Sequence, residues 1–204
     1  MQKLKIEQLA IGNYHYTNWP FEHFLKSVQE LGLKNIEIWG AKPHFLVDIQ
    51  SPDYLRTTAK KIQDAGLNVI CFCPEQNNYP VNISASETSL RRWSIEHMKH
   101  SIEAAALLGA PTVLLCPGNG TMDEQPEAIR DRFAVSAREL SQTAADNGVM
   151  SHVHTWWESI LGLNVKAVQG KPVRLEWTDT SGGLLEWWHD PGVPLAFPVE
   201  SASS

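Results

Sequence analysis

The segment GLKNIEIWG at residues 32–40 is the first clear copy of a unit that recurs along the chain. In the other copies a glycine also precedes a short apolar run: AGLNVICFC at 65–73, LGAPTVLLC at 108–116 and NGVMSHV at 147–153. Glycine is favoured just after the last turn of a helix, because the residue there adopts a left-handed conformation. A short apolar run is typical of a strand that is buried on both faces. Each copy therefore predicts the end of a helix followed by a strand.

The segment before each of these glycines has the periodicity of an amphipathic helix. Apolar residues recur three and four positions apart within 21–31, 55–62, 95–105 and 129–144, and Ser84 and Glu87 are spaced as a capping box before the third helix. We expect strands near 4–11, 35–39, 68–73, 112–116 and 149–153. This alternation predicts a parallel sheet covered by helices, and both a doubly wound sheet and a (β/α)8 barrel satisfy it. The glycine-rich motifs of nucleotide-binding folds are not found, which disfavours that function.

The composition is that of a globular protein, with 204 residues, 43% apolar and 20% charged residues, and a net charge of −6. An acidic balance without a Lys/Arg run disfavours nucleic acid as a partner. No apolar run is long enough to span a membrane, and the first residues lack the apolar core of a signal peptide. Three cysteines cannot form a fully paired disulfide framework, so we expect a cytoplasmic location. Cys71 and Cys73 are expected to pack as small apolar residues.

Polar and aromatic residues follow the predicted strands, where barrel enzymes place their active sites. Glu37 and Trp39 end the second strand, His44 lies in the loop after it, and Glu75 follows the third strand. An ionised carboxylate inside an apolar strand needs a partner. Glu37 is therefore either a functional group or the partner of a Lys or Arg at the rim. Trp39 is either a core residue or an apolar wall for a sugar ring.

His152 and His154 form a His-x-His pair on the fifth predicted strand. Alternate residues of a strand share one face, so the two imidazoles are placed to bind one divalent metal ion. Nitrogen ligands combined with carboxylates suit Mn²⁺, Co²⁺, Zn²⁺ or Fe²⁺. The alternative is that both are loop histidines with no metal.

Two loops resemble one known family. The segments GLKNIEIWGAKPH at 32–44 and CPEQNNYPVN at 73–82 resemble the sugar phosphate isomerase/epimerase family, which has a xylose isomerase-like TIM barrel, and within it the fructoselysine 3-epimerase branch. The resemblance covers about residues 5–149 and implies an incomplete (β/α)8 barrel with about five to six βα units. It also implies that substrate, a small sugar or sugar derivative, is bound by a rim that includes Glu37, Trp39, His44 and Glu75.

The resemblance further implies a reaction, epimerisation of a ketose by proton transfer next to the carbonyl through an enediolate. A divalent metal (Mn²⁺, Co²⁺, Mg²⁺ or Zn²⁺) would polarise that carbonyl. In the segment HVHTWWES at 152–159, His152 takes the place of the family's catalytic, metal-binding glutamate. Glu158 aligns with a second glutamate of the family's pattern. Asp179, in a segment similar to the family's sixth strand, joins His152 and His154 as a predicted metal ligand. A helix is expected at about 159–169.

After residue 181 the resemblance stops, and a Trp- and Pro-rich segment without apolar periodicity follows. We therefore predict a partial barrel at 1–181 and an irregular tail at 182–204. Loss of strands 7 and 8, with their His and Glu ligands, would impair activity and weaken or abolish metal binding. The alternatives are a non-catalytic truncated barrel and, disfavoured by the charge, an endonuclease IV-like enzyme. The oligomeric state stays open, although exposed tail tryptophans would favour self-association.

Overall fold

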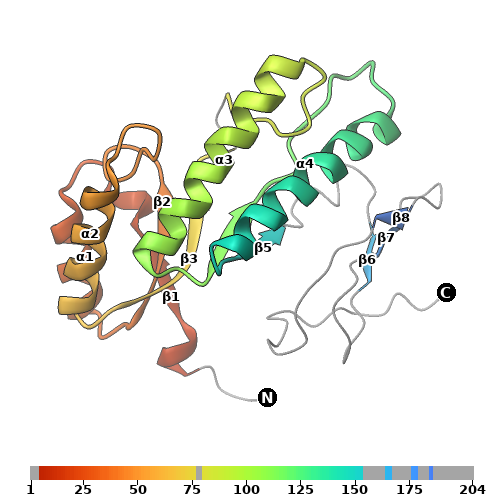
Figure 1. The fold of residues 1–204 in the computed structure, drawn as a ribbon. Helices are drawn as coiled ribbons and strands as arrows, with labels where there is room; N and C mark the ends of the chain where they lie inside the picture. Colours follow the sequence, from red (N-terminus) through yellow and green to blue (C-terminus); the bar gives the residue numbers. More distant parts are fainter. Residues whose placement is uncertain (1–4, 77–79, 154–163, 167–175, 179–183, 186–204) are drawn as a thin grey trace. The chain divides into compact units, whose positions relative to one another are not determined.

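The computed structural model describes residues 5–76, 80–153, 164–166, 176–178 and 184–185 (Figure 1). The chain divides into two compact units, Met1–His154 and Thr155–Ser204, which we describe separately. In the first unit strands and helices alternate as the sequence predicts. Its elements are η1 (Ile6–Gln8), β1 (Ala10–Gly12), η2 (Asn13–Tyr16), α1 (Phe21–Glu30), β2 (Asn35–Gly40), α2 (Pro52–Asp64), β3 (Asn68–Pro74), α3 (Thr88–Leu108), β4 (Thr112–Leu115), α4 (Pro126–Asp146) and β5 (Met150–Val153).

The five strands of the first unit form one parallel sheet in the order β1-β2-β3-β4-β5. In a doubly wound sheet the strand order reverses partway, so this sequential order excludes that alternative. Sequential parallel strands joined by helices are instead the arrangement of a (β/α)8 barrel. The fold class expected from the sequence, a partial barrel, is confirmed.

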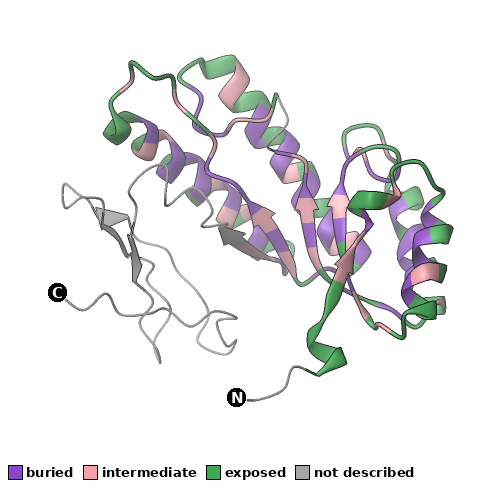
Figure 2. Ribbon diagram, turned by 180° about the vertical axis from the view of Figure 1, so that it is seen from behind, coloured by how far each residue is buried: buried purple, intermediate pink, exposed green. Residues whose placement is uncertain are grey.

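The core lies between the sheet and the helices that cover one of its faces. In Figure 2 the strands are seen in front of these helices. Strand residues alternate between buried and more exposed positions, as in β2, where Ile36 and Ile38 are fully buried while Glu37 is exposed and Trp39 half-buried. The buried set also includes Phe24, Val28, Phe72, Met98, Ile102, Leu115 and Leu140. The polar strand residues therefore lie on the face opposite the helices, which is the inner face of a barrel.

The helix ends follow the sequence signals with one exception. Gly66, for example, has φ +69°, the left-handed conformation that ends α2, and the glycines after α1, α3 and α4 share it. The predicted capping box at the start of α3 is wrong. Glu87 itself is the N-cap, and its carboxylate accepts hydrogen bonds from the backbone N–H groups of Ser89 and Leu90. Within the described residues, no helix combines the length and the apolarity that a membrane span requires.

Two predicted elements differ from the structure. The first strand is shorter than expected, because Ile6–Gln8 forms a 3₁₀ helix and β1 begins at Ala10. In the second unit, β6 (Asn164–Lys166) falls where a helix was expected, so that helix prediction is wrong for these residues. β6, β7 (Glu176–Thr178) and β8 (Leu184–Leu185) form an antiparallel three-stranded sheet.

Candidate active site

The side chain of Asn13 joins the carboxyl ends of β1 and β2. It is fully buried, and its Oδ1 accepts a hydrogen bond of 2.6 Å from the backbone N–H of Trp39. Its Nδ2 lies 3.0 Å from Nδ1 of His44 and makes a longer contact of 3.4 Å with the carbonyl of Trp39. One amide thus fixes both the end of β2 and the loop that follows it. Asn13 directly follows β1, and no local sequence pattern indicates this role.

Trp39 and Glu75 form a hydrogen-bonded pair at the ends of the neighbouring strands β2 and β3. The indole Nε1–H donates to Oε2 of Glu75 over 2.9 Å, and both side chains are half-buried. The ring of Tyr14 lies 4.5 Å from the indole, between centroids, and limits its movement on one side. We call this the Trp39–Glu75 pair. It brings an aromatic face and a carboxylate, both predicted substrate contacts, into direct contact.

Glu37 lies on the same face of β2 as Trp39, beside Cys71 in the register of β3. Glu37 is exposed, because it lies on the face of the sheet that the helices do not cover. Burial raises the pKa of the Cys73 thiol, and the nearby carboxylates of Glu37 and Glu75 raise it further. The carboxylates of Glu37 and Glu75 therefore both influence the region around Cys73 on the inner face of the sheet. Burial likewise raises the pKa of Cys71 to about 11.

The loop after β3 is held against the end of β4 by Gln76. This buried side chain donates from Nε2 to the carbonyl of Leu114 over 3.0 Å and accepts from the backbone N–H of Cys116 over 2.7 Å. Further along the loop, Asn82 donates to the carbonyl of Asn119 over 2.7 Å. Both residues fall within the loop motif that the sequence singled out. Both side chains therefore help to hold the loop that carries Glu75.

His44, a predicted substrate contact, is a buried structural residue. Its Nε2 lies 2.7 Å from the carbonyl of Trp19, which only accepts hydrogen bonds, so Nε2 carries the proton. Its Nδ1 lies within hydrogen-bond distance of the amide of Asn13, so both ring nitrogens are engaged. His44 is therefore a wall of the site and supports Trp39 through Asn13.

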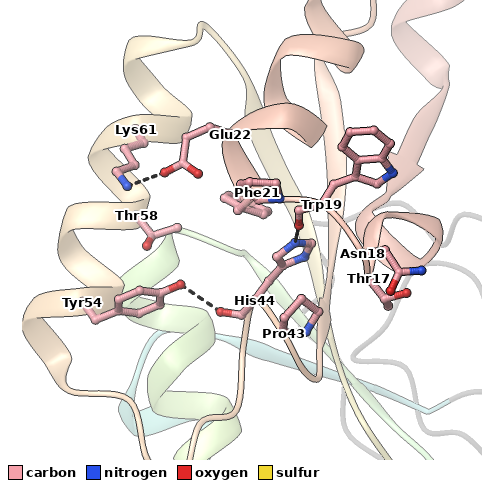
Figure 3. A pocket seen from close by; sticks show the side chains of 11 residues that line it. Thr17, Asn18, Trp19, Phe21, Glu22, Pro43, His44, Tyr54, Thr58 and Lys61 are labelled. Carbon is pink, nitrogen blue, oxygen red and sulfur yellow. Dashed lines mark hydrogen bonds and ion pairs between the residues drawn. The ribbon is translucent and has the colours of Figure 1, made fainter.

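His44 also lines a cavity of about 460 Å³ between α1 and α2, which we call the α1–α2 cavity (Figure 3). Its walls come from three segments: residues 17–22, Pro43 and His44, and one face of α2. Glu37, Trp39 and Glu75 do not line it. Of the predicted rim residues, the structure thus brings Trp39 and Glu75 together and places His44 between that pair and a separate cavity.

A second polar cluster ties the loop after β2 to α3. The carboxylate of Asp48 accepts hydrogen bonds from Nδ1 of His97 over 2.7 Å and from Nδ1 of His100 over 2.9 Å. Burial raises the pKa of Asp48, but the hydrogen bonds from the two histidines outweigh it, so the pKa is lowered. Asp48 lies about 50 residues from its partners in sequence, which is why no local pattern indicated the cluster.

The predicted catalytic and metal-binding residues lie mostly outside the described residues. This holds for His154, Glu158 and Asp179. His152 lies on β5 in register with Leu114 of β4. The described residues contain no group of three or more His, Cys, Asp or Glu side chains that could hold a metal ion. The roles of these four residues remain predictions.

Sequential parallel strands, helices on one face and polar side chains at the carboxyl ends define the class of β/α-barrel proteins. The family model of the xylose isomerase-like TIM barrel matches residues 25–167, which is more than half of the chain. The chain therefore belongs to this family, as its second and third loops indicated.

Similar proteins include sugar epimerases. The chain is 28% identical over 130 residues to fructoselysine 3-epimerase of Shigella flexneri and of Escherichia coli O157:H7, and the match covers 64% of this chain and 47% of each relative. The chain thus spans about half the length of these curated relatives. Among solved structures, 3-keto-D-glucoside 4-epimerase from E. coli has a TM-score of 0.58 at 19% identity, covering 71% of this chain and 54% of that one. D-psicose 3-epimerase has a TM-score of 0.55 at 16% identity, covering 70% and 51%. These structures show the shared fold.

Proposed function

We propose that the first unit presents the substrate-binding face of a sugar isomerase or epimerase, in which a proton moves at the carbon next to a carbonyl through an enediolate. The observation that carries the proposal is the Trp39–Glu75 pair at the carboxyl ends of β2 and β3. Active sites of β/α barrels lie at this end of the strands. Family membership and the epimerases among the relatives support the same reaction class.

The pair suits a small sugar for chemical reasons. The indole of Trp39 offers an apolar face to the C–H groups of a sugar ring, while the carboxylate of Glu75 accepts hydrogen bonds from its hydroxyl groups. The hydrogen bond between them and the contact with Tyr14 hold the indole in one orientation before substrate arrives. Such preorganisation reduces the entropy lost on binding.

Metal dependence is part of the proposal through His152, His154 and Asp179. When bound, a divalent ion would polarise the substrate carbonyl. The described residues alone do not form such a site, so we assign no step through a metal. Proton transfer by His152 or Glu158 is proposed from the family resemblance, and an imidazole differs from a carboxylate in reach and pKa.

A second candidate is a protein that binds sugar without turning it over. It is favoured by the antiparallel sheet of β6, β7 and β8, which occupies sequence where a barrel of this family continues with parallel βα units. In this case the substrate-binding face would be retained, and the enediolate would not form at a useful rate.

We also propose a cytoplasmic location. Its support is that Cys71, Cys73 and Cys116 are all free thiols, two of them half-buried and one buried. Reduced cysteines are usual in that compartment.

The test combines binding and exchange on the intact chain. Fructoselysine is titrated by calorimetry with and without Mn²⁺, and deuterium uptake at the carbon next to its carbonyl is followed by NMR in D₂O. We expect saturable binding that is about tenfold weaker in Trp39→Phe, which keeps a ring but removes the donor to Glu75. The matched control is Glu30→Gln, an exposed carboxylate on α1, which should bind like the wild type.

The outcomes separate the two candidates. Deuterium uptake that is lost in His152→Ala supports the enzyme, and binding without uptake supports the binding protein. If fructoselysine does not bind, or if Trp39→Phe binds as tightly as the wild type, the substrate-binding role of the Trp39–Glu75 pair is refuted.

A further inference from the structure

The α1–α2 cavity is a built site that the proposed reaction does not use. Its volume of about 460 Å³ lies at the small end of the range for small-molecule pockets, about 300–1,000 Å³. It is lined by residues of α1, of α2 and of the loop after β2, and by none of the carboxylates of the inner face. Any ligand here is therefore bound independently of the Trp39–Glu75 pair.

One face of α2 presents three polar groups in a row. Tyr54, Thr58 and Lys61 are four and then three positions apart, so they lie along a single stripe of the helix facing Phe21 and Glu22 (Figure 3). The phenol of Tyr54 donates to the carbonyl of His44 over 2.9 Å, and its oxygen keeps free lone pairs that a ligand hydroxyl can use.

Thr58 offers a hydroxyl group to the cavity. Its side chain lines the cavity although the residue is only 3% exposed. Across the described residues its hydroxyl has no hydrogen-bond partner in the protein. Nε2 of His97 is the one buried side-chain polar atom without a partner among the described residues, so the Thr58 oxygen is not sealed off and is open to a ligand from the cavity.

The charges in the cavity cancel. Nζ of Lys61 lies 2.5 Å from Oε1 of Glu22, so the lining holds one ammonium and one carboxylate that pair with each other. The hydrogen bond from Lys61 lowers the pKa of Glu22, and the same bond raises the pKa of Lys61, so both stay ionised at neutral pH. A ligand with a net charge would gain little here. A neutral ligand with several hydroxyls donates to the carboxylate and accepts from the ammonium.

Aromatic faces complete the lining. Trp19 lines the cavity, and its indole stacks on His23 at 4.3 Å between centroids and 15° between planes. Phe21, which is buried, and Tyr54, which is exposed, also line the cavity. Fixed aromatic rings beside hydroxyl, carboxylate and ammonium groups match the alternating C–H and O–H surfaces of a sugar ring.

We propose that the α1–α2 cavity is a second carbohydrate site, which takes a neutral monosaccharide with its hydroxyls on Thr58, Glu22 and Lys61. It binds without reaction, because none of the residues at the proposed reaction centre lines it.

The test uses a sugar that the proposed reaction cannot consume. Methyl α-D-glucopyranoside has no free carbonyl, so its binding does not depend on enediolate chemistry. It is titrated into the intact ¹⁵N-labelled chain, and backbone amide shifts are followed by NMR. We expect saturable shifts at 21–22 and 54–61 with a Kd in the millimolar range. Thr58→Val keeps the shape and removes the hydroxyl, and should weaken binding about 3- to 10-fold, the value of one hydrogen bond.

Matched variants show which residues bind methyl α-D-glucopyranoside. Lys61→Met should also weaken binding, whereas Lys60→Met, which removes an exposed ammonium one position away that pairs with Asp64, should not. Glu75→Gln should leave this binding unchanged even if it abolishes binding of fructoselysine. Shifts that do not saturate, shifts centred on Trp39 and Glu75, or wild-type affinity in both Thr58→Val and Lys61→Met would overturn the proposal.

Discussion

Replacing Asn13 by alanine tests whether one buried amide organises the candidate active site. The substitution removes the acceptor for the backbone N–H of Trp39, at 2.6 Å, and the donor to Nδ1 of His44, at 3.0 Å. Water does not readily replace them, because Asn13 is fully buried and His44 is only 4% exposed. Both groups would therefore be left without a partner in the folded state.

The expected loss in free energy of unfolding follows from the two groups that lose their hydrogen-bond partners. Each buried polar group that loses its partner costs about 1–3 kcal/mol. Trp39 is only half-buried, which places its share at the lower end, so we expect Asn13→Ala to lower the free energy of unfolding by about 2–4 kcal/mol. With a urea m-value of about 2 kcal/mol/M, the unfolding midpoint should fall by about 1–2 M.

The assay is urea unfolding followed by circular dichroism at 222 nm, which reports on the helices of the first unit. The control is Asn68→Ala, because Asn68 is exposed and its amide makes only a long contact of 3.5 Å with Asn35. We expect the control to lie within about 0.5 kcal/mol of the wild type. If Asn13→Ala is as stable as the Asn68 control, the assignment of Asn13 as the hub of the site is wrong.

Three other changes test separate parts of the structure. Asp48→Asn should lower the free energy of unfolding at pH 7. The difference from the wild type should vanish at low pH, because the stability that a carboxyl with a lowered pKa contributes is lost as the pH falls through that pKa. Urea unfolding of both proteins at pH 7 and pH 3 measures this difference. Cys116 should resist iodoacetamide at pH 8 until the chain unfolds, as mass spectrometry would show, since burial raises its pKa to about 11. Gly40→Ala should lower stability by about 1–3 kcal/mol in thermal unfolding, because the new Cβ would lie 2.7 Å from Cζ of Phe72.

The layout of the first unit could be predicted because its signals are local. A glycine after each helix and an apolar run after each glycine are short-range patterns, and they placed β2, β3, β4 and β5 to within about two residues. β1 was overextended because Ile6 and Leu9 look like strand residues, although both are exposed and Ile6 begins a 3₁₀ helix. The choice between a doubly wound sheet and a barrel needed the strand order, which periodicity does not contain.

The candidate site could be predicted only in part, because its contacts join distant segments. Trp39 and Glu75 were recognised from loops that resemble the family, but their hydrogen bond links residues 36 positions apart. Asn13 reaches residues 26 and 31 positions away, and nothing in its neighbourhood distinguishes it from an ordinary loop asparagine. His44 was predicted to contact substrate from the resemblance to the family. Only the fold shows that both nitrogens are engaged.

His44 is the element that connects the two binding regions. Through Nδ1 it meets Asn13 and so the backbone of Trp39, and through Nε2 it meets the carbonyl of Trp19 at the mouth of the α1–α2 cavity. Asn13→Ala should therefore weaken ligand binding at both places, whereas Trp39→Phe and Thr58→Val should each affect one. The free-energy changes caused by two substitutions add when their sites are distant and independent. If the two sites are distinct, the Trp39→Phe/Thr58→Val double variant should bind each sugar like the corresponding single variant. A departure from that pattern would mean that His44 transmits ligand binding from one region to the other.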